Sequence, residues 1–354
     1  MNRHVASAQV LSNVDDGVGH LTLNRPETLN ALSYEMIGLL TDALAAWRGD
    51  SEVSVVVIDG AGDRGLCAGG DVRVLYENTI AGTNENSRLF FREEYRLNAM
   101  IAGYPKPVIA IMDGITMGGG IGIAGHASIR VVTERSRIAM PETRIGFCPD
   151  VGGTWLLSHA PGELGSYLGL NATTMGSADA ILAGFADFFV PSERMAHLLQ
   201  ALAERADPGS PAEIVMLFDE TPAAPASGLA SRRAWIDACY SAGSVGEILA
   251  RLRARPEADA HAAAAELEQL SPTALTVTLA ALRAARAAPE LQDALELEYR
   301  VCSWMIEQPD LREGIRAQVI DKDRSPAWTP ATLAELPAGL AELALRHPMA
   351  DTVF

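Results

Sequence analysis

The stretch KPVIAIMDGITMGGGIGIAGHA, residues 106–127, carries the pattern that decides the fold. Its apolar, isoleucine-containing run over 107–112 predicts a buried strand rather than a surface one. A turn and three consecutive glycines at 118–120 then lead into a second apolar segment, which we predict to be a helix. A buried strand that runs through a glycine-rich turn into a helix is typical of layered α/β proteins.

The same order recurs on both sides of this stretch. The run VSVVVIDGAGD (53–63) predicts a buried strand ending at a glycine turn, and CAGGDVRVLYE (67–77) follows it with Asp71 placed to begin a helix. VGHLTLNRP (18–26) alternates as a strand does, and SIRVVTE and SRIAMPE add short strands further on. Units of strand, strand and helix therefore recur to about residue 190 and indicate an α/β fold with helices packed outside sheets.

Beyond residue 190 the composition changes to alanine, leucine, arginine and glutamate, and the apolar spacing becomes helical. Proline and glycine break the region 207–228, which we expect to be a loop or excursion. We place the main boundary so that residues 1–195 form the core and residues 196–354 a mainly helical C-terminal region. The helices are expected over 193–206, 229–253, 257–270, 273–287 and 289–307.

Composition excludes several classes of function. The 354 residues carry 28 Lys and Arg against 45 Asp and Glu, a net charge of −17, which disfavours nucleic acid and anionic membrane surfaces as partners. No apolar run approaches the roughly 20 residues of a membrane span, and MNRHVASAQVLSNVDDG at the start has no apolar signal core. The 4 cysteines are far apart and form no CxxC pair, so we expect a reducing compartment, the cytoplasm, and no structural metal.

Two glycine-rich turns are candidates for binding a developing negative charge. They are Ala68–Asp71 and Gly118–Gly120, and each precedes a predicted helix. Glycine lets backbone N–H groups approach a ligand closely, and the first N–H groups of a helix are unpaired. Two such turns facing each other would form a two-donor oxyanion hole for a carbonyl oxygen. Tight packing or a phosphate site would explain either turn alone, although neither matches G-x-G-x-x-G or the P-loop.

Two acidic residues lie in the apolar, bend-rich stretch AMPETRIGFCPDVGGTWLL, residues 139–157. Glu142 follows a proline at the end of a short predicted strand, and Asp150 follows a second proline. One interpretation is structural, with Glu142 capping a helix and Asp150 as the N-cap of a helix over 151–157. The other is a carboxylate pair at one scissile bond, in which one group attacks or activates water and the other positions or protonates. Spacing alone leaves both interpretations open.

The other candidate groups favour structural roles. Cys67 precedes the first glycine turn, but no histidine lies near it in sequence, so we expect a buried packing thiol. His126 and His159 form no pair with metal-ligand spacing and are expected to be core or surface residues. No G-x-S-x-G elbow occurs, which disfavours a serine hydrolase.

The longest motifs resemble the enoyl-CoA hydratase/isomerase (crotonase) superfamily. They are LTLNRPETLNAL, LCAGGDVRVLYE, the stretch from PKPVIAIMDG to PDVGGTWLL, and AGFADFFVPSERM. FFREEYRLN (90–98), GITMGGG, the MPET to PDVGG segment and the tail over 296–328 are similar to the 3-hydroxyisobutyryl-CoA hydrolase branch. The resemblance spans nearly the whole chain. It implies a crotonase-like spiral of strand–strand–helix repeats with a helical C-terminal region.

The resemblance also implies roles for individual residues. The oxyanion donors fall on Gly70 and Gly119, the acidic catalytic positions of the hydrolase branch on Glu142 and Asp150, and a substrate-contacting position on Glu94. A typical hydratase has a second glutamate shortly after the triple glycine, where this chain has Gly122. Two-glutamate hydration of a double bond is therefore disfavoured, and thioester hydrolysis is favoured.

By this resemblance the chain is an acyl-CoA thioester hydrolase, acting foremost on 3-hydroxyisobutyryl-CoA in valine breakdown. Glu142 either attacks the carbonyl or activates water, and no cofactor is implied, since coenzyme A is part of the substrate. The alternatives are an enoyl-CoA hydratase or isomerase with one acid/base glutamate and a non-catalytic acyl-CoA-binding paralogue. Relatives commonly form trimers or hexamers, so a homo-oligomer is possible, although the helical C-terminal region could replace a neighbour's contacts.

Coenzyme A is an anion, so an acidic chain needs local cations to hold it. The candidates from the sequence are Arg25 after the first strand, Arg73 beside the first glycine turn, and Lys322. Lys322 lies between Asp321 and Asp323, and a solvated ion pair with these neighbours is its simpler interpretation.

Overall fold

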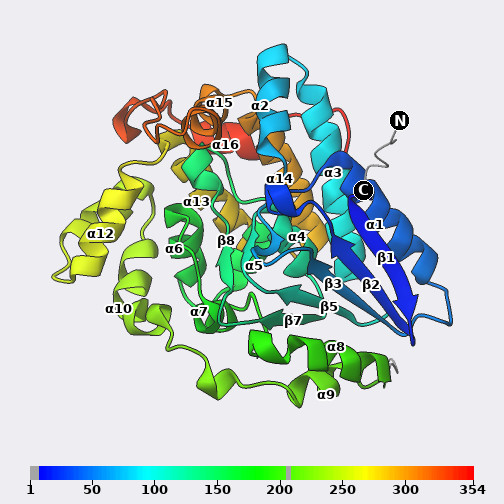
Figure 1. Cartoon of the computed structure of the whole chain (residues 1–354). Helices are drawn as coiled ribbons and strands as arrows, with labels where there is room; N and C mark the ends of the chain where they lie inside the picture. The colour runs from blue at the N-terminus through cyan, green and yellow to red at the C-terminus, as the bar shows by residue number, and fades with distance from the viewer. Residues whose placement is uncertain (1–7, 205–208) are drawn as a thin grey trace.

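The computed structural model describes residues 8–204 and 209–354 and has two sheets within a shell of helices (Figure 1). In the large sheet β1 runs antiparallel to β2, and every other neighbouring pair is parallel. Its strands, in spatial order, are β1 (Val10–Asp15), β2 (Val18–Leu23), β3 (Val55–Gly60), β5 (Val108–Met112), β7 (Ile129–Val132) and β9 (Phe188–Phe189). The small parallel sheet contains β4 (Gly65–Cys67), β6 (Ile115–Met117) and β8 (Arg137–Ala139).

The chain alternates between these two sheets. Each of β3, β5 and β7 belongs to the large sheet and is followed at once by β4, β6 or β8 of the small one. The central strands β3 and β5 are buried almost throughout, as their uninterrupted valine and isoleucine runs require. This alternation is the expected spiral of strand, strand and helix, and the predicted α/β crotonase-like fold is confirmed.

In the first half of the chain α1 (Tyr34–Trp47) follows β2 of the large sheet, and the other helices come after small-sheet strands. These others are α2 (Val72–Ala81), α3 (Asn84–Ala102), α4 (Gly119–Ala124), α5 (Gly153–His159), α6 (Leu164–Asn171) and α7 (Ser177–Leu182). The Ser33 side chain caps α1 by accepting a hydrogen bond from the Met36 N–H at 3.1 Å. α4 is buried along its whole length, whereas no residue of α2 is fully buried.

The second half is helical, as predicted. It contains α8 (Met195–Glu204), α9 (Pro211–Met216), α10 (Gly228–Tyr240), α11 (Val245–Arg253), α12 (Ala258–Leu267), α13 (Pro272–Arg286), α14 (Leu291–Met305), α15 (Pro309–Ile315) and α16 (Leu340–Leu345). The single helix expected over 229–253 is two, because Ser244 caps α11 after a break. The region 207–228 includes α9 as well as loop, and residues 205–208 lie outside the described part of the chain.

The two halves share hydrophobic contacts. One buried cluster joins residues of α1 and α3 to residues of α13, α14 and α16. A second cluster covers the outer face of the large sheet, where Leu198 and Leu202 of α8 meet Val55, Val57 and Ile109 (Figure 1). A division after residue 195 coincides with the beginning of α8, and it stays a prediction.

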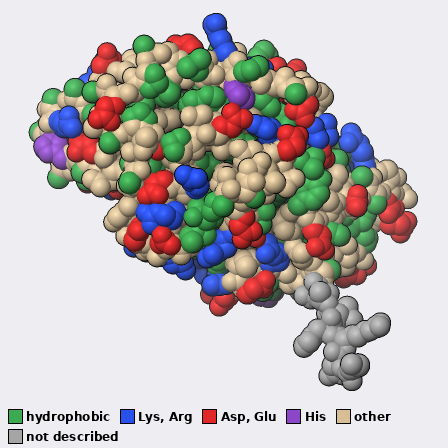
Figure 2. Space-filling view, turned by 90° about the horizontal axis from the view of Figure 1, so that it is seen from above, with side chains coloured by type: hydrophobic (Ala, Val, Ile, Leu, Met, Phe, Trp, Pro, Cys, Tyr) green, Lys and Arg blue, Asp and Glu red, His purple; other side chains and the backbone are tan. Residues whose placement is uncertain are grey.

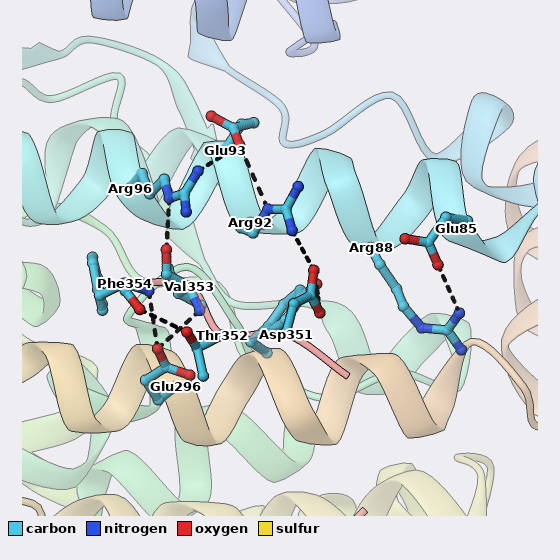
Figure 3. A network of polar contacts seen from close by, with 11 residues as sticks. Glu85, Arg88, Arg92, Glu93, Arg96, Glu296, Asp351, Thr352, Val353 and Phe354 are labelled. Carbon is cyan, nitrogen blue, oxygen red and sulfur yellow. Dashed lines mark hydrogen bonds and ion pairs between the residues drawn. The ribbon is translucent and has the colours of Figure 1, made fainter. Parts of the chain in front are cut away.

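The last described residues lie between α3 and α14 (Figure 3). Arg92 of α3 forms an ion pair with Asp351, and Arg96 donates a hydrogen bond to the Val353 carbonyl at 2.6 Å. From the other side, Glu296 of α14 accepts the Val353 N–H at 2.8 Å. This segment therefore ties an N-terminal helix to a C-terminal one. No helix within the described ranges is long and apolar enough to cross a membrane.

Candidate active site

One cavity of about 630 Å³ is lined by residues of the first half of the chain, with Gln318 and Val319 added from the second half. Apolar side chains make up most of its wall, which comes from α2, α3, the two glycine turns, the 3₁₀ helix η2 (Glu142–Ile145) and the π-helix η5 (Arg316–Ile320). Glu94, Glu142 and Asp150 are its buried carboxylates, and Gly70 and Gly119 also line it. The structure thus brings together every catalytic candidate expected from the sequence, in an enclosed site of the size that small ligands occupy.

The two glycine turns abut each other at this cavity. A Cβ atom placed on Gly119 would lie 3.2 Å from the backbone nitrogen of Gly70, so a side chain there would crowd the other turn. Gly69 and Gly118 adopt positive φ angles of 112° and 50°, which turn the chain out of β4 and β6. Within the described residues, the N–H groups of Gly70 and Gly119 have no backbone acceptor. Two free donors side by side are what a carbonyl oxygen needs as it becomes an oxyanion.

Glu142 stands beside the second glycine turn. It begins η2 directly after Pro141, and its side chain is 7% exposed. Its Oε1 atom would be 2.9 Å from a Cβ atom on Gly118, and among the described residues Oε2 is buried with no hydrogen-bond partner. Glu142 therefore does not cap a helix with its side chain. A buried carboxylate oxygen with no protein partner remains available to a ligand.

Asp150 faces the cavity from a strained turn. Tyr95 of α3 donates a hydrogen bond from its hydroxyl to Asp150 Oδ2 at 3.0 Å. Val151 and Gly152 then adopt positive φ angles of 54° and 78°, and α5 begins only at Gly153. Because Gly152 is the N-cap of that helix, the helix-cap interpretation of Asp150 is not what the structure shows.

Glu94 comes from α3, one residue before Tyr95, and is 2% exposed. Its Oε1 atom would be 2.5 Å from a Cβ atom on Gly119, and within the described chain that oxygen is buried without a hydrogen-bond partner. One helical turn earlier, the ring of Phe90 lies 3.5 Å from the position of a Cβ atom on Gly70. α3 therefore places both a carboxylate and an aromatic ring over the oxyanion donors.

Burial is the main cause that raises the pKa values of all three carboxylates. Burial raises the pKa of Asp150 to about 7, although the Tyr95 hydrogen bond opposes the shift by favouring the ionised form. Burial and then the charge of Asp150 raise the pKa values of Glu94 and Glu142 well above normal. The charge of ionised Asp150 thus contributes to the upward shifts of Glu94 and Glu142.

This chain has Gly122 at the position where a typical hydratase has its second glutamate. A Cβ atom on Gly122 would lie 2.7 Å from Cβ of Val151 and 2.8 Å from Nδ2 of Asn98. Asn98 is fully buried, and within the described ranges neither of its amide atoms has a hydrogen-bond partner. The space beside Gly122 is thus filled by α3 and by the turn after Asp150.

Three residues at or next to the site were not found from the sequence. Tyr95 binds Asp150, Asn98 packs against Gly122, and Glu298 of α14 binds the turn that follows Asp150. Tyr95 had a signal, since it adjoins Glu94 in REEY. No feature of the sequence pointed to Glu298, because only the tertiary fold brings it to residues 152–154.

None of the three sequence-based candidates for holding coenzyme A lines the cavity among the described residues. Arg25 lies 3.4 Å from Asp71, and Arg73 donates to the Val319 carbonyl at 3.2 Å. Asp321 and Asp323 were the expected ion-pair partners of Lys322, but both form ion pairs with Arg316 instead. Arg144, which the sequence did not single out, does line the cavity. On the face in Figure 2, acidic and basic side chains are interspersed.

Among the groups expected to be structural, the cysteines are buried, His126 is half-buried and His159 is exposed. Burial raises the pKa of the Cys67 thiol to about 12, and all 4 cysteines are unpaired and buried. Burial lowers the pKa of His126 to about 4, and its Nε2 atom lies 2.8 Å from the Val151 carbonyl oxygen. His159 packs on Trp155 instead of facing the cavity. No cluster of three metal-ligating side chains occurs in the part of the chain that the structure describes.

Comparison with known proteins gives consistent matches. A family model described as enoyl-CoA hydratase/isomerase matches residues 18–343. A protein of Danio rerio named 3-hydroxyisobutyryl-CoA hydrolase, mitochondrial, is 41% identical over 93% of this chain and 87% of its own length. The Homo sapiens protein of the same name is 38% identical over 95% of this chain and 88% of its own.

Solved structures match as well. One described as a carnitinyl-CoA dehydratase from Mycobacterium thermoresistibile has a TM-score of 0.92 and 44% identity, covering 98% of both chains. One described as an enoyl-CoA hydratase from Rhodobacter sphaeroides 2.4.1 has a TM-score of 0.88 and 42% identity, covering 96% of this chain and 98% of its own.

Proposed function

This chain belongs to the enoyl-CoA hydratase/isomerase family, and on that premise we propose that it hydrolyses acyl-CoA thioesters, with 3-hydroxyisobutyryl-CoA as its main substrate. The products are 3-hydroxyisobutyrate and coenzyme A, a reaction of valine degradation. The relatives that bear this activity in their names match this chain over most of their own length.

The reaction follows from the groups around the cavity. The thioester carbonyl oxygen accepts hydrogen bonds from the N–H groups of Gly70 and Gly119, which stabilise the oxyanion formed by attack on the carbonyl carbon. The Glu142 carboxylate either attacks that carbon, forming a mixed anhydride, or removes a proton from an attacking water. The C–S bond then breaks, and the sulfur leaves as the coenzyme A thiolate, which takes up a proton. In the anhydride route a water molecule afterwards releases the acid and restores Glu142.

Glu94 and Asp150 provide the contacts to the acyl group. Both carboxylates line the cavity, and Glu94 stands next to Gly119, close to the oxyanion donors. A hydroxyl group on the acyl chain would donate to one of them, because these carboxylate oxygens have few donors within the protein. We propose that this contact selects 3-hydroxyacyl groups. No metal or redox group takes part in these steps as we propose them.

The observation that carries the proposal is the environment of Gly122. Hydration of a double bond by two glutamates needs a second carboxylate there, and Asn98 and Val151 already fill the space. Glu142, the carboxylate beside the second glycine turn, suits attack on a carbonyl carbon.

A hydratase or isomerase is the second candidate. It is favoured by the two solved structures described as a dehydratase and a hydratase at 44% and 42% identity. Such an enzyme would use the same oxyanion donors and would move a proton at the α-carbon with Glu142 alone. A protein that binds acyl-CoA without turnover is the third candidate.

The test is a panel of short acyl-CoA compounds assayed in two ways. A thiol reagent detects release of coenzyme A, and ultraviolet absorbance detects loss of the enoyl-thioester chromophore. We expect thiol release from 3-hydroxyisobutyryl-CoA to be fastest, with little loss of the enoyl chromophore. Efficient hydration of enoyl-CoA without thiol release would establish the second candidate. Binding by calorimetry without either reaction would establish the third.

The location and assembly of the protein are separate proposals. The relatives from Danio rerio and Homo sapiens are named as mitochondrial. For this chain we propose the cytoplasm, which the 4 unpaired cysteines support. We propose acyl-CoA as its only ligand class. Light scattering of the purified protein decides between a monomer and a homo-oligomer.

A further inference from the structure

Glu298 is a buried carboxylate of the C-terminal region that binds the turn behind Asp150. It lies on α14 and is 1% exposed. Its Oε2 atom accepts the Gly152 N–H at 2.6 Å, and its Oε1 atom accepts the Thr154 N–H at 2.8 Å together with the Thr154 hydroxyl. Three donors converging on one buried carboxylate form a strong, directional anchor.

The turn that it anchors is strained. Val151 is β-branched and has a φ angle of 54°, a conformation that is unfavourable for such a residue and persists only where the surroundings impose it. From the opposite side, His126 contacts the Val151 carbonyl, and a Cβ atom on Gly152 would lie 2.3 Å from His126 Nε2. The turn is therefore held between α14 and the end of α4.

We propose that Glu298 is a positioning residue of the reaction, which holds the 150–154 turn so that Asp150 faces the substrate. This inference rests on the proposed function, and it adds a requirement for the C-terminal helical region. Without that region the strained turn would have no partner at Gly152 and Thr154.

The charged and titratable groups around Glu298 come from several elements. Asp150 and Glu142 lie on the cavity side, and Tyr95 lies on α3. Cys148 lies in the segment before Asp150, and Cys302 lies on α14. Burial raises the pKa of Glu298 to about 8, while its three donors oppose the shift because they favour the carboxylate. The charge of Glu298 in turn raises the pKa of Glu142.

The decisive variant is Glu298→Gln, which keeps the size of the side chain and removes its charge. An amide has one acceptor oxygen, so its NH₂ group faces a donor and the turn shifts. We expect kcat to fall about 10²-fold, the scale of a misplacement of roughly 1 Å, with KM changed much less. The acid limb of the pH–rate profile should move to lower pH, because Glu142 loses a neighbouring negative charge.

A matched control exists on the same helix. Glu296→Gln makes the same exchange at a carboxylate that accepts the Val353 and Phe354 N–H groups outside the cavity. We expect it to leave kcat and the pH profile unchanged. If Glu298→Gln does not fold, Thr154→Val keeps the buried carboxylate and removes only one donor. Thr154→Val should lower kcat less than Glu298→Gln does, and Thr154→Ser, which keeps the hydroxyl, should restore kcat.

Two results would overturn the inference. One is a folded Glu298→Gln protein with wild-type kcat and pH profile, and the other is an equal effect from Glu296→Gln. All variants are compared with the wild type on whichever acyl-CoA the wild type converts, including by hydration. Failure of the hydrolase proposal, which appears in the wild type, is therefore distinguishable from failure of the role of Glu298.

Discussion

Glu142 is the residue on which the proposed chemistry depends most. It is the carboxylate beside the glycine turn of the oxyanion donors, and one of its oxygens has no partner within the described residues. Glu142→Gln keeps the shape and removes the nucleophile or base. We expect kcat for thiol release to fall by about 10²–10⁴-fold, the usual scale for acid–base groups, with a much smaller change in KM. Near-normal turnover would remove Glu142 from the mechanism.

Asp150 makes the stability of the protein depend on pH. Its pKa rises from 3.8 to about 7 on folding, so between those values the folded protein binds more protons than the unfolded chain. The free energy of unfolding therefore falls as pH rises through that window. Asp150→Asn removes this contribution, on the order of 1–4 kcal/mol. In denaturant titrations, the free energy of unfolding should fall less between pH 4 and pH 7 in the variant than in the wild type. An equal fall in both proteins would contradict the burial argument.

At the scale of elements, α3 and α4 decide which reaction the site permits. α3 supplies Phe90, Glu94, Tyr95 and Asn98 from one side of a single helix, at the spacing of successive turns. α4 is short and buried and passes close to α3 because Gly122 has no side chain. The pair of helices therefore leaves room for one carboxylate at the oxyanion donors besides Glu94.

Gly122→Glu tests this packing. Restoring the glutamate of a typical hydratase should not create an efficient hydratase, because the side chain meets Asn98 and Val151 and Asp150 shapes the opposite wall. Loss of the enoyl chromophore of a short enoyl-CoA should stay slow. Efficient hydration would show that the site is closer to a hydratase than we propose.

Alanine substitutions at two glycines, one crowded and one open, test in denaturant titrations how tightly Gly122 is packed. Gly122→Ala should lower the free energy of unfolding by about 1–3 kcal/mol, as overpacking does. Gly38→Ala, in α1 with nothing within 4 Å of the new Cβ atom, should be neutral or stabilising by up to about 1 kcal/mol.

At the scale of the whole molecule, contacts of the last residues join the distant helices α3 and α14. Asp351 pairs with Arg92 of α3 (Figure 3). It also accepts a hydrogen bond from Tyr299 of α14 at 3.1 Å. Asp351→Asn should lower the free energy of unfolding by about 1 kcal/mol, because both groups lose a charged partner. Glu85→Gln, which breaks an exposed ion pair with Arg88 on the same helix, should change it by less than about 0.5 kcal/mol. If denaturant titrations gave equal changes for Asp351→Asn and Glu85→Gln, the contacts of Asp351 would have no special role in stability.

Recognition of coenzyme A also belongs to this scale, because a local cation must act against a net charge of −17. Lys322 follows the π-helix η5, which lines the cavity, and its acidic neighbours pair with Arg316 instead. If Lys322 contacts a phosphate, Lys322→Ala should raise KM for coenzyme A thioesters and spare a truncated pantetheine thioester. The loss should shrink as salt rises.

Two results would move the assignment away from Lys322. Equal damage to both thioesters would mean that Lys322 is structural, and Arg25 and Arg73 would become the better candidates. Arg144→Ala, made in parallel, tests the one arginine that lines the cavity among the described residues.

The sequence by itself determined the local features of this protein. Uninterrupted valine and isoleucine runs specify the buried strands β3 and β5, and glycines specify the two turns after β4 and β6. Hydrophobic periodicity and glycine backbone freedom act over a few residues, so they can be predicted from neighbours alone. The resemblance then pointed to Gly70, Gly119, Glu142, Asp150 and Glu94, and the structure places all five at one cavity.

Only the tertiary structure decided how these groups are arranged. Whether Asp150 caps a helix or faces a cavity depends on Tyr95 and on the turn at Val151, and that turn is held by Glu298 from α14. Gly122 excludes a second carboxylate because Asn98 of a different helix fills the space beside it. Such contacts depend on how helices pack after the chain has folded, and burial raises the carboxylate pKa values only once that packing removes water.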